Sequence, residues 1–144
     1  MKKPLVIEVI CGSLALLFSY TAFSKLADFE NFRKQLSMQV FPPAVVEILL
    51  YLIPGIELLA VILIIVKGSR LLGLILSLLL LVLFTGYIAL VLSGYYDHIP
   101  CSCGGVLNSL GWQTHLWFNI FFLVLSFAGL MFQYQILSGG KMKK

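Results

Sequence analysis

The sequence predicts an all-α integral membrane four-helix bundle, with a short amphipathic interfacial helix after the first span. Hydrophobic residues make up 60% of the 144 residues and only 11% are charged, whereas soluble proteins average about 25% charged residues. Four apolar stretches reach the roughly 20 residues that a helix needs to cross a hydrocarbon core. Only helices satisfy their backbone groups internally at such lengths. We therefore expect one membrane domain over residues 1–144.

The four expected spans differ in the charges that they contain. The first contains Glu8, the second has Glu57 near its middle, and the third has no charge. Lys2 and Lys3 before an apolar run are also typical of a signal peptide. The long run, its acidic residue and the lack of a clear cleavage site favour an uncleaved helix. The spans are expected at about residues 5–24, 48–66, 71–92 and 116–134.

The loop between the first two spans has a helical pattern of its own. Its apolar side chains recur at roughly helical spacing, with charges between them: Phe29, Phe32, Leu36 and Val40. This pattern predicts a short amphipathic helix on the outer interface. Proline disfavours helix in the residue before it, so we expect the Phe-Pro-Pro run at residues 41–43 to end this helix.

Basic residues indicate the orientation of the chain in the membrane. The first loop holds Lys25, Arg33 and Lys34, and the loop at residues 93–115 has no basic residue. Under the positive-inside rule, both termini face the cytoplasm and the 93–115 loop faces outward. We expect the inner membrane of a bacterium, with this loop in the periplasm, where disulfides are permitted. The other basic residues lie on the opposite side: Lys2, Lys3, Lys67, Arg70, Lys141, Lys143 and Lys144.

The outward loop contains the most informative motif of the chain, a pair of cysteines one residue apart. Cys101 and Cys103 lie between Pro100 and two glycines. A disulfide across such a short spacer departs from ordinary geometry, and strained, exposed disulfides are the labile, exchanging ones. It would close almost no loop, so it would add little as a structural crosslink. The pair therefore favours a redox dithiol, with a structural or inert pair as the alternative.

Other uses of the cysteines and of the basic residues are less favoured. The chain has no second Cys/His pair at metal-ligand spacing, and the Cys-x-x-Cys-His motif of c-type haem is absent. We expect no metal site. The net charge of +4 comes from residues beside the apolar spans, a pattern that membrane orientation explains. The lipid bilayer is the expected partner, and nucleic acid is not.

Two histidines are candidates for activating these thiols. Trp112, His115 and Asn119 share one face at the outer mouth of the fourth span. An imidazole at this position can help to form a thiolate, the reactive species. The alternative for His115 is an interfacial side chain that binds a backbone carbonyl beside a tryptophan. His98, three residues before Cys101, is the second candidate.

Three further residues have both a functional and a structural interpretation. Glu57 at mid-membrane depth is costly and is expected to face the bundle or a water-filled cavity. It is protonated or paired with Lys25, and either state is compatible with a proton or quinone site or with simple packing. Cys11 is expected to pack as a small hydrophobic residue. Glu8 and Glu47 are expected to be solvated near the interfaces.

Four short motifs follow one another along the spans. They are Ser24-Lys25-Leu26 with Phe32 downstream, Pro54 followed by Glu57, the Cys101–Gly105 motif, and Trp112 with His115 and Asn119. In this order they resemble the MauE/DoxX-type redox-associated membrane proteins, especially the branch of the methylamine utilisation protein MauE. Gly105 stands where many relatives have an aromatic residue. The resemblance covers most of the chain.

The resemblance implies a four-helix bundle and a role in periplasmic thiol-disulfide or electron-transfer chemistry. MauE itself is associated with maturation of methylamine dehydrogenase, a periplasmic redox enzyme. A thioredoxin-like periplasmic protein is an expected partner, and a quinone is the one cofactor considered. Two alternatives stay open. In a quinone-linked oxidoreductase subunit of the DoxX/DoxD kind, Glu57 matters more than the cysteines. In a non-catalytic membrane assembly factor or small transporter, the cysteines are dispensable.

Overall fold

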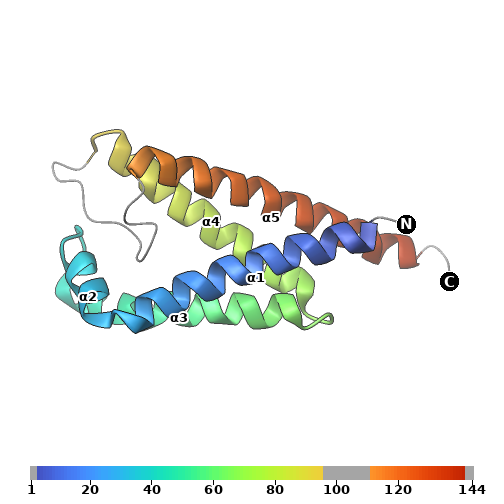
Figure 1. The fold of residues 1–144 in the computed structure, drawn as a ribbon, viewed down its shortest axis with the longest axis horizontal. Coiled ribbons are helices and arrows are strands. Elements are labelled where there is room, and N and C mark those ends of the chain that lie inside the picture. The colour runs from blue at the N-terminus through green and yellow to red at the C-terminus, as the bar shows by residue number, and fades with distance from the viewer. Residues whose placement is uncertain (1–2, 96–110, 142–144) are drawn as a thin grey trace.

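The computed structural model describes residues 3–95 and 111–141, and every regular element in this part of the chain is a helix (Figure 1). Four of the helices are long and apolar enough to cross a membrane. The predicted all-helical membrane bundle is therefore confirmed. The helices are α1 (Lys3–Ala27), α2 (Phe29–Ser37), α3 (Pro43–Ile65), α4 (Arg70–Leu92) and α5 (Trp112–Lys141).

The long helices extend beyond the expected spans. α3 begins at Pro43 instead of near residue 48, and α5 runs through Lys141 instead of ending near residue 134. Pro42 and Pro43 explain the early start of α3. Pro42 has the extended backbone of an N-cap, and a proline in the first turn of a helix loses no hydrogen bond. Hydropathy alone predicts only the apolar part of such a helix.

The four long helices pack as a ring. α1 lies against α3, α3 against α4, α4 against α5, and α5 against α1. Both termini lie at one end of the bundle together with the turn between α3 and α4, and α2 lies at the other end (Figure 1). Of the basic residues assigned to one side of the membrane, Lys3, Lys67, Arg70 and Lys141 lie within the described residues, at the start of α1, in the α3–α4 turn, at the start of α4 and at the end of α5. They therefore share one end of the bundle, and the orientation in the membrane stays a prediction.

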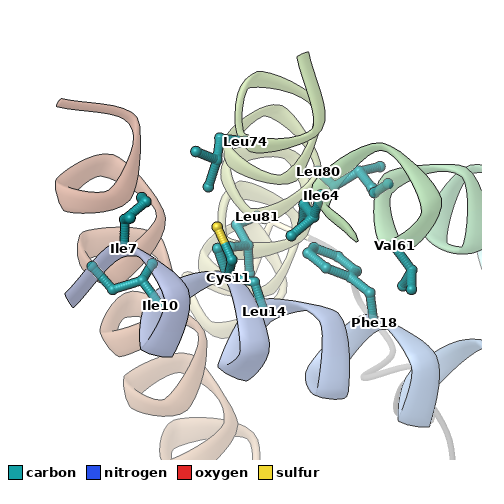
Figure 2. Packing of buried hydrophobic residues seen from close by; sticks show 11 residues of the cluster. Ile7, Ile10, Cys11, Leu14, Phe18, Val61, Ile64, Leu74, Leu80 and Leu81 are labelled. Carbon is teal, nitrogen blue, oxygen red and sulfur yellow. The ribbon is translucent and has the colours of Figure 1, made fainter. Parts of the chain in front are cut away.

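A hydrophobic cluster fills the half of the bundle near the termini. Buried side chains from α1, α3 and α4 meet there, and Cys11 lies among them, as expected for a buried free thiol (Figure 2). α3 and α4 approach each other closely at Gly73. A Cβ atom at this position would lie 2.6 Å from the backbone nitrogen of Ile64. The α3–α4 hairpin therefore requires a residue without a side chain here.

An ion pair joins α1 to the α3–α4 turn at the same end of the bundle. Arg70 donates two hydrogen bonds to Glu8, from Nη1 to Oε1 at 2.9 Å and from Nη2 to Oε2 at 3.2 Å. Its Nε also donates to the carbonyl of Ile64 at 3.3 Å. The expectation that Glu8 is only solvated is therefore wrong. An arginine 62 residues away in the sequence packs beside it in the bundle.

The short helix α2 is present where the loop pattern predicts it. It buries Phe32 and Leu36 against Val46 and Leu50 of α3. It ends at Ser37, before the Phe-Pro-Pro run that was expected to end it, and Val40 is exposed beyond it. The Ser37 hydroxyl donates to the carbonyl of Lys34 at 2.8 Å. Such side-chain bonds satisfy the last carbonyls of a helix and favour an early end.

Candidate functional site

A buried ion pair lies between α1 and α3. Nζ of Lys25 is 2.8 Å from Oε1 of Glu57, and the two side chains are 4% and 1% exposed. The lysine also donates to the backbone carbonyl of Thr21 at 3.3 Å. Glu57 is seven residues from both Leu50 and Ile64, which are buried. Residues spaced by seven share one helix face, so the carboxylate points into the bundle.

The burial of this ion pair has a cost in hydration free energy. Removing an ion from water costs several kcal/mol even after the protein relaxes, and the attraction between partners only offsets that loss. Ionisable groups inside membrane spans are rare and line functional sites or ion paths. The structure shows the contact with Lys25 that the sequence analysis considered for Glu57. The pair marks a candidate site.

Two polar side chains of α5 are buried in the same half of the bundle. His115 and Asn119 are one helical turn apart, and both are buried. The backbone N–H of His115 donates to the carbonyl of Gly111 at 3.0 Å, which fixes the histidine in the first turn of α5. α5 as a whole is described from Trp112, whose side chain is not among the described side chains.

A small cavity brings these side chains together. It has a volume of about 30 Å³ and lies between α1, α3, α4 and α5. We call it the polar cavity. Four side chains singled out from the sequence line it, although they come from three different helices. Its polar lining consists of Thr21, Lys25, Glu57, His115 and Asn119.

Two atoms that face this region have no hydrogen-bond partner among the described residues. They are Oε2 of Glu57 and Nδ1 of His115, and both are buried. A buried polar atom without a partner costs about 1–3 kcal/mol. The lining is also rich in aromatic and aliphatic carbon, with Phe18, Leu81 and Phe84 among the contributors. The site therefore combines charge, unused hydrogen-bonding capacity and a low-dielectric wall.

A larger cavity lies beside the polar cavity, between α2, α3 and α4. It has a volume of about 380 Å³, and we call it the apolar groove. Lys25 and Phe84 line both spaces. Leu52 and Leu83, which also line the groove, are largely exposed on the outside of the bundle. The groove therefore borders the surface that faces lipid.

The other predicted site residues lie outside the described part of the chain. Cys101, Cys103 and His98 fall within residues 96–110. The predicted approach of His115 to the cysteines therefore stays a prediction. Among the described residues, no group of three or more His, Cys, Asp or Glu side chains is arranged to hold a metal ion.

The structure adds buried polar residues that the sequence analysis did not single out. Ser126 and Gln133 are buried on α5, and Gln35 is buried on α2. The first two follow Asn119 at steps of seven residues. This repeat of polar side chains on an apolar helix was a readable signal, because residues spaced by seven share a face. Gln35 had no comparable signal.

Comparison with known proteins gives one clear match. The family model described as "Methylamine utilisation protein MauE" matches residues 3–132, a range that includes every residue that lines the polar cavity. Searches of curated proteins and of solved structures give no significant match. The matched range covers most of the chain, and the description points to a role in methylamine utilisation. This helical membrane protein therefore belongs to the MauE family.

Proposed function

We propose that this protein carries out dithiol/disulfide exchange at the periplasmic face of a bacterial inner membrane. It would thereby support maturation of a periplasmic redox enzyme such as methylamine dehydrogenase. Membership of the MauE family and the Cys-x-Cys motif at residues 101–103 support this function. The observation that carries it is the polar cavity, because a bundle with only a structural role has no need for a buried ion pair beside a buried histidine.

The proposed reaction balances without a cofactor. A thiolate from Cys101 or Cys103 attacks a disulfide of the partner protein, and one partner sulfur leaves and takes up a proton. The second cysteine then displaces the other partner sulfur, which also takes up a proton. The pair becomes a disulfide and the partner becomes a dithiol, so two electrons and two protons have moved. Both steps need a thiolate, whose formation a nearby base favours.

The polar cavity supplies groups that can handle these protons. His115 is in the first turn of α5, so its imidazole follows the loop that carries the cysteines. Glu57 and Lys25 lie across the cavity from it, on α3 and α1. A partner is required, because a single dithiol must pass its electrons onward. We propose a thioredoxin-like periplasmic protein or the redox enzyme itself.

The apolar groove favours a second candidate function, that of a quinone-linked membrane subunit. Its volume of about 380 Å³ is in the range of small-molecule sites, which are mostly apolar with a few polar groups. Lys25 and Gln35 are polar residues of its lining, and aromatic rings such as that of Phe84 are apolar ones. In this case Glu57 would serve quinone reduction, and the cysteines would be secondary.

The redox state of the cysteines in intact cells tests the first candidate. We would label cells that express a Cys11→Ser variant with a membrane-impermeant thiol reagent, before and after reduction. The dithiol from which the proposed reaction starts should be labelled before reduction, and its disulfide product should be labelled only after reduction. The matched control is a Cys101→Ser/Cys103→Ser variant that retains Cys11, which is buried and should not be labelled. No labelling under either condition would contradict the proposed outward dithiol.

Partner capture and growth then separate the candidates. Cys103→Ala should leave Cys101 in a mixed disulfide with its partner, visible as a reducible adduct. If growth on methylamine requires the cysteines, exchange is supported. If growth requires Glu57 but neither cysteine, the quinone-linked function is supported. If neither is required, the protein is a non-catalytic assembly factor.

A further inference from the structure

The polar cavity contains two hydrogen-bonding atoms that no side chain satisfies. Oε1 of Glu57 is held by Lys25, whereas Oε2 is buried without a partner among the described residues. Nδ1 of His115 is likewise buried without a hydrogen-bond partner among the described residues. The two residues come from α3 and α5 and line one space. Both residues that carry these unsatisfied atoms therefore border the same small space.

The dimensions of the cavity suit water. A water molecule needs about 10–15 Å³ of cavity volume and two or more polar partners. The cavity offers about 30 Å³, which is room for one or two molecules. The side chains of Thr21 and Asn119 provide further polar groups on the wall. An apolar cavity of this size would stay dry, but this one has polar groups from three helices.

The cavity is closed toward the end of the bundle that bears the termini. Phe18 and Leu81 line it and also belong to the hydrophobic cluster that fills that half. Leu14 and Ile64 of this cluster are almost completely buried beneath them. His115, by contrast, is in the first turn of α5, at the end of the bundle where α4 ends and α5 begins. Any exchange of protons is therefore directed to that end.

We propose that the polar cavity binds water, and that this water passes a proton between Glu57 and His115. In one direction the Glu57 carboxyl gives a proton to the water, and the water gives another to Nδ1 of the imidazole. The products are a carboxylate paired with Lys25 and an imidazolium. No electron moves, and the net charge of the three side chains is unchanged. The step therefore forms one negative and one positive group in the low-dielectric interior, and the net charge there stays the same.

The groups that face Glu57 are few, which makes the relay well defined. α1 contributes Lys25 and the hydroxyl of Thr21, and α5 contributes His115 and Asn119. α4 contributes only apolar side chains to the cavity, and α2 does not line it. Lys25 bonds to Oε1 and to a backbone carbonyl. Of the described titratable groups, only His115 is therefore placed to exchange a proton with Oε2 through water.

The purpose of this proton relay rests on the proposed exchange function, whereas the water and the proton transfer do not depend on it. During exchange, one thiol must lose a proton and a partner thiolate must gain one. A store of one proton at the start of α5, which follows the dithiol loop in the sequence, would meet this need. The test therefore measures water and protonation in the isolated protein, without any thiol partner, so its failure is distinguishable from failure of the exchange function.

Infrared difference spectroscopy of the purified protein in lipid nanodiscs, titrated with pH, provides the test. We expect bands of bound water that shift in H₂¹⁸O, and a carboxyl band that changes together with an imidazole band. Glu57→Gln should remove the carboxyl change, and His115→Phe should uncouple it from pH. Leu81→Phe fills the cavity without removing a polar group and should abolish the shifted water bands. If Leu81→Phe does not fold, Leu17→Phe is the alternative variant, because Leu17 also lines the cavity.

The matched control is Leu79→Phe, the same change on the same helix at a position that faces outward. It should leave all of these bands unchanged. The proposal is overturned if the wild-type protein shows no ¹⁸O-sensitive water band. It is equally overturned if a folded Leu81→Phe or Leu17→Phe variant keeps the coupled carboxyl and imidazole changes.

Discussion

The two ion pairs that join different helices at opposite ends of α1 differ in almost every respect except their chemistry. Near the termini, Arg70 holds both carboxylate oxygens of Glu8, and the glutamate is 51% exposed. In the other half, Lys25 holds one oxygen of Glu57, and both side chains are almost fully buried. The first pair crosslinks α1 to a turn with little loss of hydration. The second gives up hydration and leaves an oxygen unused.

This contrast indicates which of the two pairs is the better candidate for a role other than stability. Hydrophobic residues of similar volume often replace a buried ion pair without loss of stability, whereas removing one partner leaves a stranded charge. A half-exposed pair contributes modestly, because water and salt screen it. We therefore propose a functional role for the buried pair and expect the other pair to be structural.

Breaking the buried pair should give the largest effect on stability. Glu57→Leu leaves the ammonium of Lys25 without its carboxylate and should destabilise the bundle by about 3–5 kcal/mol. The double variant Lys25→Met/Glu57→Leu should recover most of this loss. Denaturant unfolding in detergent micelles measures both. A double variant that stays as unstable as Glu57→Leu alone would show that the pair is instead a net source of stability.

Disturbing the close approach of α3 and α4 should give the second-largest loss of stability. Gly73→Ala places a Cβ 2.6 Å from a backbone nitrogen of α3 and should cost about 1–3 kcal/mol through overpacking. It also displaces the turn that carries Arg70, so the Glu8–Arg70 pair should weaken. Gly86→Ala on the same helix meets nothing within 4 Å and is the matched control. Equal unfolding midpoints for the two variants would contradict the predicted contact.

Removing the Glu8–Arg70 pair should have a smaller effect that depends on salt. Glu8→Gln should destabilise the protein only slightly, because the pair is partly solvated, and the difference from wild type should shrink in high salt. The stability difference caused by Glu57→Leu should hardly change with salt, because that site is buried. Thermal unfolding at two ionic strengths compares them. A salt-independent loss at Glu8 would remove the distinction between the two pairs.

The pair Arg33–Glu47 should give the smallest effect. Its atoms are 3.3 Å apart, and its side chains are 41% and 57% exposed. Arg33→Gln should change the free energy of unfolding by less than about 0.5 kcal/mol, within the range of exposed pairs. The same unfolding assay applies. A loss above 1 kcal/mol would show that α2 depends on this contact more than on its burial of Phe32 and Leu36.

The sequence predicts the elements of this fold better than their mutual contacts. Long apolar runs identify α1, α3, α4 and α5, because a lipid environment leaves few other structures. The same apolar character hides which face of each helix points inward, since lipid-facing and core-facing positions look alike. The partner of Glu8 was missed for this reason. It depends on α1 meeting the α3–α4 turn, which no local pattern reports.

The candidate site was predictable where polar residues interrupt an apolar helix. Glu57, Lys25, His115 and Asn119 were singled out one by one, and the structure brings them to one cavity. The sequence predicted only one of these contacts, the pairing of Lys25 with Glu57. It did not predict that His115 and Asn119 line the same cavity. The early end of α2 depends on hydrogen bonds of Ser37 and Gln39 to carbonyls of the same helix. Such bonds compete with the proline signal and are hard to rank from sequence.

Lys25 and Phe84 line both the polar cavity and the apolar groove, so a change at one space can reach the other through them. A molecule that enters the groove and draws on the ammonium group weakens its hold on Glu57. By reciprocity, a change of protonation at Glu57 must alter the affinity of the groove by the same factor. Lys25 would then couple the apolar groove to the polar interior of the bundle.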